Sequence, residues 1–589
     1  MRWRDLQYAS CQRLSRCSDA AQLFILRYLR KRELQLQLRR RLCVSGCDAA
    51  QCTNEPCKNV VCDQPPASSC VDAKTQRTYP ISGTCGGAGV CSYAPTDVNC
   101  AHGCQSGICQ PASGGGGGCS GISLTWAHNL SDWVNTNSQG IALRSISSYA
   151  DGSFIAAGSI AGPVQLGSGT PQQVTLTGAQ LNSGVLVRFS SDGSFASGHI
   201  LVASQGGSEI AQVKGLPDGG ALVYGSFAGI ATFDYGAPGS VQLHPVDDES
   251  GYDVFLARID SNDHLVWLRQ IGGQDLDQPW SMDTMSDGSS VLAARVGGLG
   301  SDVTISVGQP DAVDLSLPSG KWEQVLLVKY DAAGKIKWTN LFGGSSRDDQ
   351  VNDLRTLSDG STVIVGQYQT DIQFPGQNFT GKANYTPYLF LARYLSDGSF
   401  SWARSVNDST AIASALQVSS TGTLLITGNT GAAATFGSGE STQVSFGSGP
   451  DNAFIAEYQT SGGFLGLRAI GSGSSSLGDS AFFVTPTGDL FIGGDIYYSY
   501  TFSTSKGAQT INSTGWEDGY LACASASGPI EWIDTASGNQ HEYVTAFAMS
   551  KNGDLLVVGT NSSDVSFSNG TTLPLGNLWD NTFIAKYKL

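Results

Sequence analysis

The sequence is short of charge, of methionine and of long apolar stretches. Charged residues are 14% of its 589 residues, and only four residues are methionine. No run of about 18 apolar residues occurs, which excludes a membrane-spanning helix. Metalloprotease, P-loop and nucleophile-elbow motifs are missing, and no two cysteines have the CxxC spacing of common zinc sites. The sequence therefore offers no recognisable catalytic motif, and we expect no cofactor.

The charge lies unevenly along the chain. Residues 1–41 carry eleven Lys or Arg against three Asp or Glu, whereas the other residues carry 23 against 47, for a net charge of −16. An acidic surface repels phosphates, so we expect no nucleic-acid partner. The basic stretch at 23–42 is either an amphipathic helix on an anionic membrane or an extension translated from a misplaced start site, without native structure. The second interpretation is favoured because nothing downstream resembles this stretch.

Cysteine is abundant only near the N-terminus. Fourteen of the fifteen cysteines lie in the first 119 residues, among few large apolar residues. Such a segment cannot bury a core and needs covalent staples, so we predict disulfides and an oxidising compartment, with zinc as the alternative. His102 is the only histidine nearby, which disfavours zinc. The predicted disulfide cysteines are Cys52, Cys57, Cys62, Cys70, Cys85, Cys91, Cys100, Cys104, Cys109 and Cys119.

Cys47 is a candidate for lipidation instead. Residues 44–47, Val-Ser-Gly-Cys, resemble a bacterial lipobox, in which the cysteine is lipidated. A signal sequence needs about 7–15 apolar residues before its cleavage site, and too few separate the arginines at 39–41 from this one. One observation favours lipidation, because without Cys47 an even number of ten cysteines remains from Cys52 to Cys119 for pairing.

Composition divides the chain into four parts. Residues 84–109 resemble the short Cys-rich modules that precede repeat domains in large secreted bacterial proteins, which implies an exported stalk. A run of five glycines follows, and polyglycine is a flexible tether. We therefore predict a basic leader at 1–46, a Cys-rich disulfide module at 47–110, a Gly-rich linker at 111–118 and a repeat domain at 119–589.

From residue 122 onward the sequence repeats itself at intervals of 62 to 72 residues. The first marker of each repeat is a polar-glycine turn before a β-branched run. A second marker, about 30 residues later, is two short strands joined by a Gly-containing turn. Each repeat thus holds four antiparallel strands, which is one propeller blade. The first marker begins at Asp151, Asp218, Asp287, Asp359, Thr421, Thr487 and Asn552.

The two ends of the repeat region complete each other. The last repeat stops at Leu589, before its fourth strand, and residues 122–126 form an orphan strand whose Trp126 takes the place of Trp267 in an internal repeat. We predict that residues 122–126 pair with residues 583–589 and close a ring of seven blades, which removes both free edges. The tryptophan of each outer strand should pack on the neighbouring sheet.

One position of the third strand departs from its pattern. A charged residue recurs in the middle of this strand, and Cys523 takes its place in the sixth repeat. A catalytic cysteine needs a nearby histidine and an electropositive setting, which the sequence lacks. We therefore interpret Cys523 as a buried free thiol. The recurring charged residues are Arg188, Arg258, Lys329, Arg393, Glu457 and Lys586.

Residues 254–273, and residues 325–344 followed by 359–366, resemble the repeats of the seven-bladed β-propeller family of secreted bacterial proteins. This resemblance covers residues 122–589 and implies an all-β, seven-bladed propeller of four-stranded antiparallel blades. It implies little about function, because propellers serve many tasks. Residues 331–338 also resemble the tryptophan-docking motif of quinoprotein dehydrogenases, but those propellers are eight-bladed, and this sequence has longer repeats and no adjacent cysteine pair.

Loops that join one blade to the next share a face with the loops after each second strand, and in propellers this face usually carries the ligands. Acidic residues occupy these loops here. Their oxygens suit calcium, although no DxDxDG loop occurs, and solvated loop carboxylates are the alternative. The acidic candidates are Asp275, Asp277, Asp348, Asp349, Asp408 and Asp479.

These observations favour a monomeric, non-catalytic protein, extracellular or at the cell surface, that binds a protein or a glycan on this face. It would meet a membrane only through a lipid anchor. The alternative is a propeller enzyme, a lyase or a glycosidase, that uses the same carboxylates at the channel mouth. A third interpretation is a structural envelope component without a small ligand.

Overall fold

The chain divides into two compact units, Met1–Gly114 and Gly115–Leu589, and the division falls within the polyglycine stretch. The predicted basic leader lies outside the described residues. In the computed structural model the described residues are 69–72, 74–78, 84–85, 90–99, 104–105, 108–109, 119–130, 140–179, 181–246, 251–274, 277–297, 302–317, 323–345, 349–381, 387–406, 410–447, 451–473, 477–526, 528–575 and 581–589.

The described parts of the first unit are short antiparallel strands. They form a three-stranded sheet of order β1-β2-β5 and the pairs β3-β4 and β6-β7. Arg77 in β2 and Asp97 in β5 form an ion pair of 2.7 Å across this sheet. Cys91 is disulfide-bonded. The bounds are Ser69–Asp72 for β1, Thr75–Thr78 for β2, Thr84–Cys85 for β3, Cys91–Ser92 for β4, Thr96–Asn99 for β5, Cys104–Gln105 for β6 and Ile108–Cys109 for β7.

The other cysteines predicted to form disulfides in this unit are not described as side chains. Residues 47, 52, 57, 62 and 100 lie outside the described residues, and residues 70, 85, 104 and 109 lie in strands of which only the backbone is described. Their pairing therefore stays a prediction.

All described secondary structure is β-strand, and the described residues include no helix that could span a membrane. The second unit is built from antiparallel runs of four strands, each named here for its first strand. The first strands are β9 (Gly140–Ser148), β15 (Ser208–Gly215), β21 (Gln278–Thr284), β27 (Gln350–Thr356), β33 (Ala411–Val418), β39 (Leu477–Val484) and β43 (Glu542–Met549).

The remaining strands of these runs follow in the same order. The second strands are β10 (Phe154–Ala161), β16 (Ala221–Ala228), β22 (Ser290–Val296), β28 (Thr362–Tyr368), β34 (Leu424–Thr430), β40 (Leu490–Thr504) and β44 (Leu555–Asn561). The third strands are β13 (Ser183–Phe189), β19 (Tyr252–Ile259), β25 (Gln324–Tyr330), β31 (Tyr388–Tyr394), β37 (Asn452–Tyr458), β41 (Gly507–Ala524) and β47 (Asn581–Lys588). The fourth strands are β14 (Phe195–Ser204), β20 (Leu265–Gly273), β26 (Ile336–Phe342), β32 (Phe400–Val406), β38 (Phe464–Gly473), β42 (Ile530–Ser537) and β8 (Ser123–Asn129).

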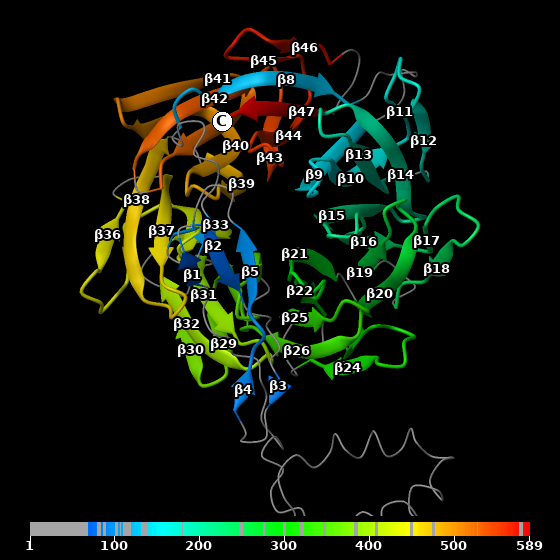
Figure 1. Ribbon diagram of the computed structural model, residues 1–589, viewed down its shortest axis with the longest axis horizontal. Helices are drawn as coiled ribbons and strands as arrows, with labels where there is room; N and C mark the ends of the chain where they lie inside the picture. The colour runs from blue at the N-terminus through cyan, green and yellow to red at the C-terminus, as the bar shows by residue number, and fades with distance from the viewer. Residues whose placement is uncertain are drawn as a thin grey trace, which may run out of the picture. The chain divides into compact units, whose positions relative to one another are not determined.

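These runs form a propeller-like ring of sheets (Figure 1). Each first strand contacts the first strands of its two neighbours, and the series closes because β43 contacts β9. The hydrophobic core lies between neighbouring runs. One cluster joins Val291 and Val325 of the β21 run to Ile364 and Phe390 of the β27 run. Second and third strands are buried on both faces, which explains their continuous apolar sequences.

In most runs a short hairpin follows the second strand in sequence and precedes the third. In the β39 run the extension belongs to the main strands themselves, because β40 and β41 continue outward as one long hairpin. Residues 471–473 of β38 pair with this hairpin, so the β33 and β39 runs share one sheet instead of forming separate sheets as expected. A short hairpin of the β43 run also joins this sheet and brings it to ten strands. The hairpin strands are β11 (Pro163–Leu166), β12 (Val174–Thr177), β17 (Ala231–Phe233), β18 (Val241–Leu243), β23 (Asp302–Ile305), β24 (Val313–Ser316), β29 (Asp371–Phe374), β30 (Gln377–Thr380), β35 (Ala434–Phe436), β36 (Val444–Phe446), β45 (Val565–Phe567) and β46 (Thr572–Leu573).

The two ends of the repeat region pair as the sequence predicts. Strand β8 lies antiparallel to β47, with Ala127 opposite Ala585 and Trp126 opposite Lys586. Figure 1 shows the blue strand β8 beside the red strand β47. The first sheet-forming segment after the linker therefore completes the last run, and β47 is paired on both sides.

The predicted packing of the outer-strand tryptophans is confirmed. The Trp402 indole lies over Gly462 in the turn between the third and fourth strands of the next run, where a Cβ would come within 2.9 Å of the ring. Its Nε1 donates a hydrogen bond to the Thr460 carbonyl at 3.1 Å. Trp338 lies over Gly398 in the same way. The turn glycine is thus needed both for its positive φ and for the close approach of the indole.

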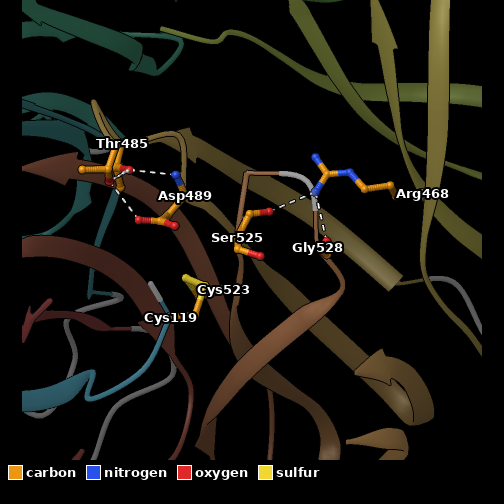
Figure 2. Close-up of a disulfide and its surroundings, with 8 residues drawn as sticks. Cys119, Arg468, Thr485, Asp489, Cys523, Ser525 and Gly528 are labelled. Atoms are coloured by element: carbon orange, nitrogen blue, oxygen red, sulfur yellow. Dashed lines mark hydrogen bonds between the residues drawn. A yellow bond between two sulfur atoms is a disulfide. The ribbon is translucent and has the colours of Figure 1, made fainter. Parts of the chain in front are cut away.

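The interpretation of Cys523 as a free thiol is wrong. Cys523 forms a disulfide with Cys119, which lies just before β8, and both residues are buried (Figure 2). The partner is 404 residues away in sequence, so no local pattern reveals it. Cys119 was predicted to pair with another cysteine of the Cys-rich segment, but its partner lies in the ring.

The disulfide stands where other runs use polar contacts. Three of the third-strand charged residues, Arg188, Lys329 and Arg393, reach the turn between the third and fourth strands of the next run, as where Arg188 Nε donates to Asp263 Oδ1 at 2.7 Å. Arg393 likewise donates to the Thr460 carbonyl at 3.0 Å. The β43 run has no such turn, because its third strand, β47, and its fourth strand, β8, come from opposite ends of the repeat region. The disulfide to Cys119 makes the connection there.

Candidate functional site

One face of the ring carries the starts of the first strands. In each run the first strand is antiparallel to the second, with Ser208 opposite Phe227 in the β15 run. The start of each first strand therefore lies beside the end of the second strand. We call this side the loop face, and it is the face on which the sequence predicts ligands.

Two of the predicted acidic residues are buried at the edge of this face. Asp277 precedes β21, is fully buried, and accepts hydrogen bonds from the amides of Gly273 at 2.7 Å and Gly297 at 2.9 Å. Asp349 precedes β27 and accepts a hydrogen bond from the Gly344 amide. Both carboxylates tie the loop between two runs to the following first strand, which is a structural role.

The side chains of the other four predicted acidic residues are not described. Asp275, Asp348 and Asp408 lie outside the described residues, and only the backbone of Asp479, in β39, is described. In the described part of the chain, no three His, Cys, Asp or Glu side chains are grouped so as to hold a metal ion. A calcium site formed by these residues therefore stays a prediction.

A different group of polar and aromatic side chains gathers on the loop face. The base of the long β40–β41 hairpin meets the start of β43 there, and a backbone bridge joins Glu517 to His541. We call this group the aromatic–acid cluster. It consists of Asp495, Tyr497, Tyr498, Trp516, Glu517, His541 and Tyr543.

Glu517 is the centre of this cluster. Its Oε2 lies 2.6 Å from His541 Nδ1 and accepts a hydrogen bond from the Tyr543 hydroxyl. The Trp516 and His541 rings are stacked at 6.4 Å, and the His541 and Tyr543 rings at 6.3 Å. A carboxylate, an imidazole and a phenol are thus held in fixed relation beside an indole.

The aromatic side chains of the cluster face the solvent. Trp516 is 53% exposed and Tyr498 is 56% exposed, the largest exposed fractions among the described tryptophans and tyrosines. Tyr498 has a φ of +61° at a β-bulge, and its ring centroid lies 4.0 Å from that of Tyr497. Successive strand residues normally point to opposite faces, so the bulge brings the two rings to one side.

Burial perturbs two carboxyl groups near Glu517. Burial, aided by the charge of Glu517, raises the pKa of Asp495 to about 6. Burial also raises the pKa of Glu542 to about 7, with the charge of Asp518 acting in the same direction. Among the described residues no lysine or arginine forms an ion pair with Asp495, Glu542 or the two acids beside them, Glu517 and Asp518. The site can therefore accept or release protons near neutral pH.

The sequence analysis did not select these residues. No local pattern predicts them, because the paired groups lie far apart in sequence: His541 pairs with Glu517, and His264 pairs with Asp234. The available signal was the density of aromatic residues at 496–500, where three of five residues are tyrosine.

The ring of sheets, with a mixed aromatic and acidic site on its loop face, defines an all-β protein with a propeller arrangement. No protein-family model matches the chain. The regulatory protein FlaEY of Caulobacter vibrioides is 27% identical over 154 residues, which are 26% of this chain and 15% of that protein. The chain thus spans less than a sixth of that relative's length.

Solved structures show only distant likeness. A crystal structure of a eukaryotic initiation factor is 9% identical, with a TM-score of 0.29, and the match covers 69% of this chain and 90% of that one. The extracellular domain of a protein assigned to the hybrid two-component systems of B. thetaiotaomicron is 10% identical, with a TM-score of 0.16, over 75% of this chain and 78% of that one.

Proposed function

We propose that this chain is an exported, non-catalytic binding protein, a seven-bladed propeller that holds a glycan on its loop face. The aromatic–acid cluster carries the proposal. Exposed Trp516 and Tyr498 offer flat apolar surfaces for the faces of sugar rings, and Glu517 and His541 offer polar atoms for hydroxyl groups. Tryptophan and tyrosine also dominate the energetics of protein interfaces, so a protein ligand on the same surface is the second form of this proposal.

Two further observations support parts of the proposal. One blade for each first strand gives seven, and each of these strands contacts both its neighbours. The disulfide between Cys119 and Cys523, together with the bonded Cys91, favours an oxidising compartment such as the cell exterior.

The cysteine count no longer favours a lipid on Cys47. Because Cys119 pairs with Cys523, nine cysteines remain from Cys52 to Cys109, and Cys47 makes an even ten. We propose that Cys47 belongs to the disulfide-rich stalk. Mass spectrometry of the N-terminal peptide before and after reduction distinguishes a disulfide from a lipid at this position.

The binding test uses the full chain, purified under oxidising conditions, on a glycan array and then in calorimetry with the best glycan. Trp516→Ala should weaken binding at least about tenfold, since aromatic anchors contribute above 1 kcal/mol to such contacts. Tyr235→Ala is the matched control, because Tyr235 is 40% exposed and lies outside the cluster. The proposal fails if no glycan or protein ligand binds, or if both variants bind like the unchanged chain.

A glycan-cleaving enzyme is the alternative, and one observation favours it. Asp495, with its pKa raised to about 6, lies near ionisable Glu517, which is how acid and base roles are separated in carboxylate pairs. Incubating the full chain with bound glycans and measuring new reducing ends or unsaturated products decides between the two. Turnover that disappears in both Asp495→Asn and Glu517→Gln would replace the binding proposal with the enzyme.

A further inference from the structure

A β-bulge recurs in every first strand of the ring. The register between first and second strands shifts once in each run, and the shift inserts one extra residue into the first strand. Bulges re-aim side chains and are frequent beside ligand sites. The bulged residues are Arg144, Ala211, Trp280, Asn352, Ser414, Ser480 and Thr545.

Bulged residues line two adjoining cavities at the centre of the ring. A cavity of about 490 Å³ is lined by residues of all the first strands, among them Arg144 and Thr545. A second cavity of about 460 Å³ is lined by Trp280. Asn352 and Ser414 line both cavities, so the two adjoin. Their sizes suit a small organic ligand.

Most charges in the larger cavity are already paired. Lys214 lies 3.3 Å from Asp283, and Arg355 lies 2.6 Å from Asp353. Backbone hydrogen bonds also hold both carboxylates in place. Asp283 accepts a hydrogen bond from the Thr356 amide and Asp353 accepts one from the Leu416 amide, each at 2.9 Å. Although burial raises the pKa of Asp283, Lys214 and Arg355 hold it below its ordinary value. These two pairs contribute no net charge.

Arg144 is the remaining cation of the cavity. It forms an ion pair only at the long distance of 4.0 Å, with Glu209, and 58% of its side chain is exposed. The residues that line the cavity include three cations against two carboxylates, with Glu209 outside this lining, in a protein whose net charge is −16. A guanidinium in this setting favours a carboxylate, which it can bind through two parallel hydrogen bonds.

The wall beside Arg144 is apolar. Strand β43 lies next to β9, and Thr545 Oγ1 donates to the carbonyl of Leu143, the residue before Arg144, at 3.3 Å. Phe547 and Met549 of β43 and Phe483 of β39 line the same cavity and are only partly buried. A ligand whose carboxylate meets Arg144 would therefore place its body against aromatic and thioether groups.

We propose that the central cavity binds a small organic carboxylate with an aromatic body. Its carboxylate pairs with Arg144, and its ring lies against Phe483, Phe547 and Met549. This site is separate from the aromatic–acid cluster, which has acidic groups and would repel the same ligand. The chain then holds two ligands of different chemistry, an extended one on the loop face and a small anion at the centre.

The test is calorimetry of the full chain at low salt with 2-naphthoate, its neutral analogue 2-naphthamide, and acetate. We expect 2-naphthoate to bind at least tenfold more tightly than 2-naphthamide, and acetate to give no measurable heat. Arg144→Gln should bind the acid and the amide alike. Because Arg144 is mostly exposed, this variant should keep the melting temperature of the unchanged chain.

Two control variants locate the probe. Lys337→Gln removes an exposed cation from β26, outside the cavity, and should keep the preference for the acid. Trp516→Ala alters the cluster and should also keep it. The proposal is overturned if 2-naphthoate does not bind, if acid and amide bind equally, if Arg144→Gln keeps the preference, or if Trp516→Ala abolishes binding.

Discussion

Removing the disulfide between Cys119 and Cys523 should strongly destabilise the ring. The two residues are 404 positions apart, and the chain-entropy relation for a loop of this size gives about 6 kcal/mol of stabilisation from restricting the unfolded chain. Measured effects of native disulfides are commonly about 2–5 kcal/mol. We therefore expect a loss of about 3–6 kcal/mol in the free energy of unfolding.

Alanine is the suitable replacement, because a serine hydroxyl at the fully buried Cys523 position would add the cost of an unpaired polar group. The assay is urea denaturation of Cys119→Ala, Cys523→Ala and the double variant. Each single variant already breaks the bond, so the second substitution should cost about 1 kcal/mol or less. Additive losses in the double variant, or both thiols reactive in the unreduced native chain, would refute the reasoning.

Three further predictions concern single contacts. Gly462→Ala places a Cβ at a φ of +88° and 2.9 Å from the Trp402 ring, and should lower the free energy of unfolding by about 2–4 kcal/mol. Gly422→Ala, at a φ of +81° with open space around the Cβ, should lower it by about 1–2 kcal/mol. Equal losses of the two variants in urea denaturation would contradict the packing of Trp402 on Gly462. Asp277→Asn weakens the hold on the Gly273 and Gly297 amides and should cost about 1–3 kcal/mol, against about 0.5 or less for exposed Asp302→Asn. For Glu542, burial raises the pKa from an ordinary 4.5 to about 7, so the folded state keeps a proton that the unfolded chain loses. The unchanged chain should therefore lose stability relative to Glu542→Gln as pH rises from 4.5 to 7, and stop losing it above 7; a difference in melting temperature that is constant with pH would show the reasoning to be wrong.

Local sequence patterns foretold much of the ring. Turn glycines such as Gly462 and outer-strand tryptophans such as Trp402 recur at fixed spacing, and the structure joins them directly. The pairing of residues 122–126 with the last strand followed from the missing fourth strand of the final repeat. These features are short-range or periodic, which is why one sequence is enough to find them.

Features set by long-range geometry were missed. The Cys119 thiol finds Cys523 because ring closure brings them together, and the pattern of nearby cysteines suggested other partners. Asp277 was correctly placed in a loop between runs, but only the folded loop shows that two backbone amides occupy its carboxylate. The aromatic–acid cluster joins β40, β41 and β43, and no spacing rule predicts that Glu517 meets His541.

The staple at Cys119 also decides how the ring responds to tension. A pull on the chain that precedes Cys119 reaches the ring at this residue, four residues before β8 begins. Without the covalent link, such a pull would peel β8 from β47 one hydrogen bond at a time. The sulfur bridge diverts the load into β41, a central strand of the adjacent run that is paired on both sides. The chain that precedes Cys119 is thereby attached to two sheets at once, one through β8 and one through β41.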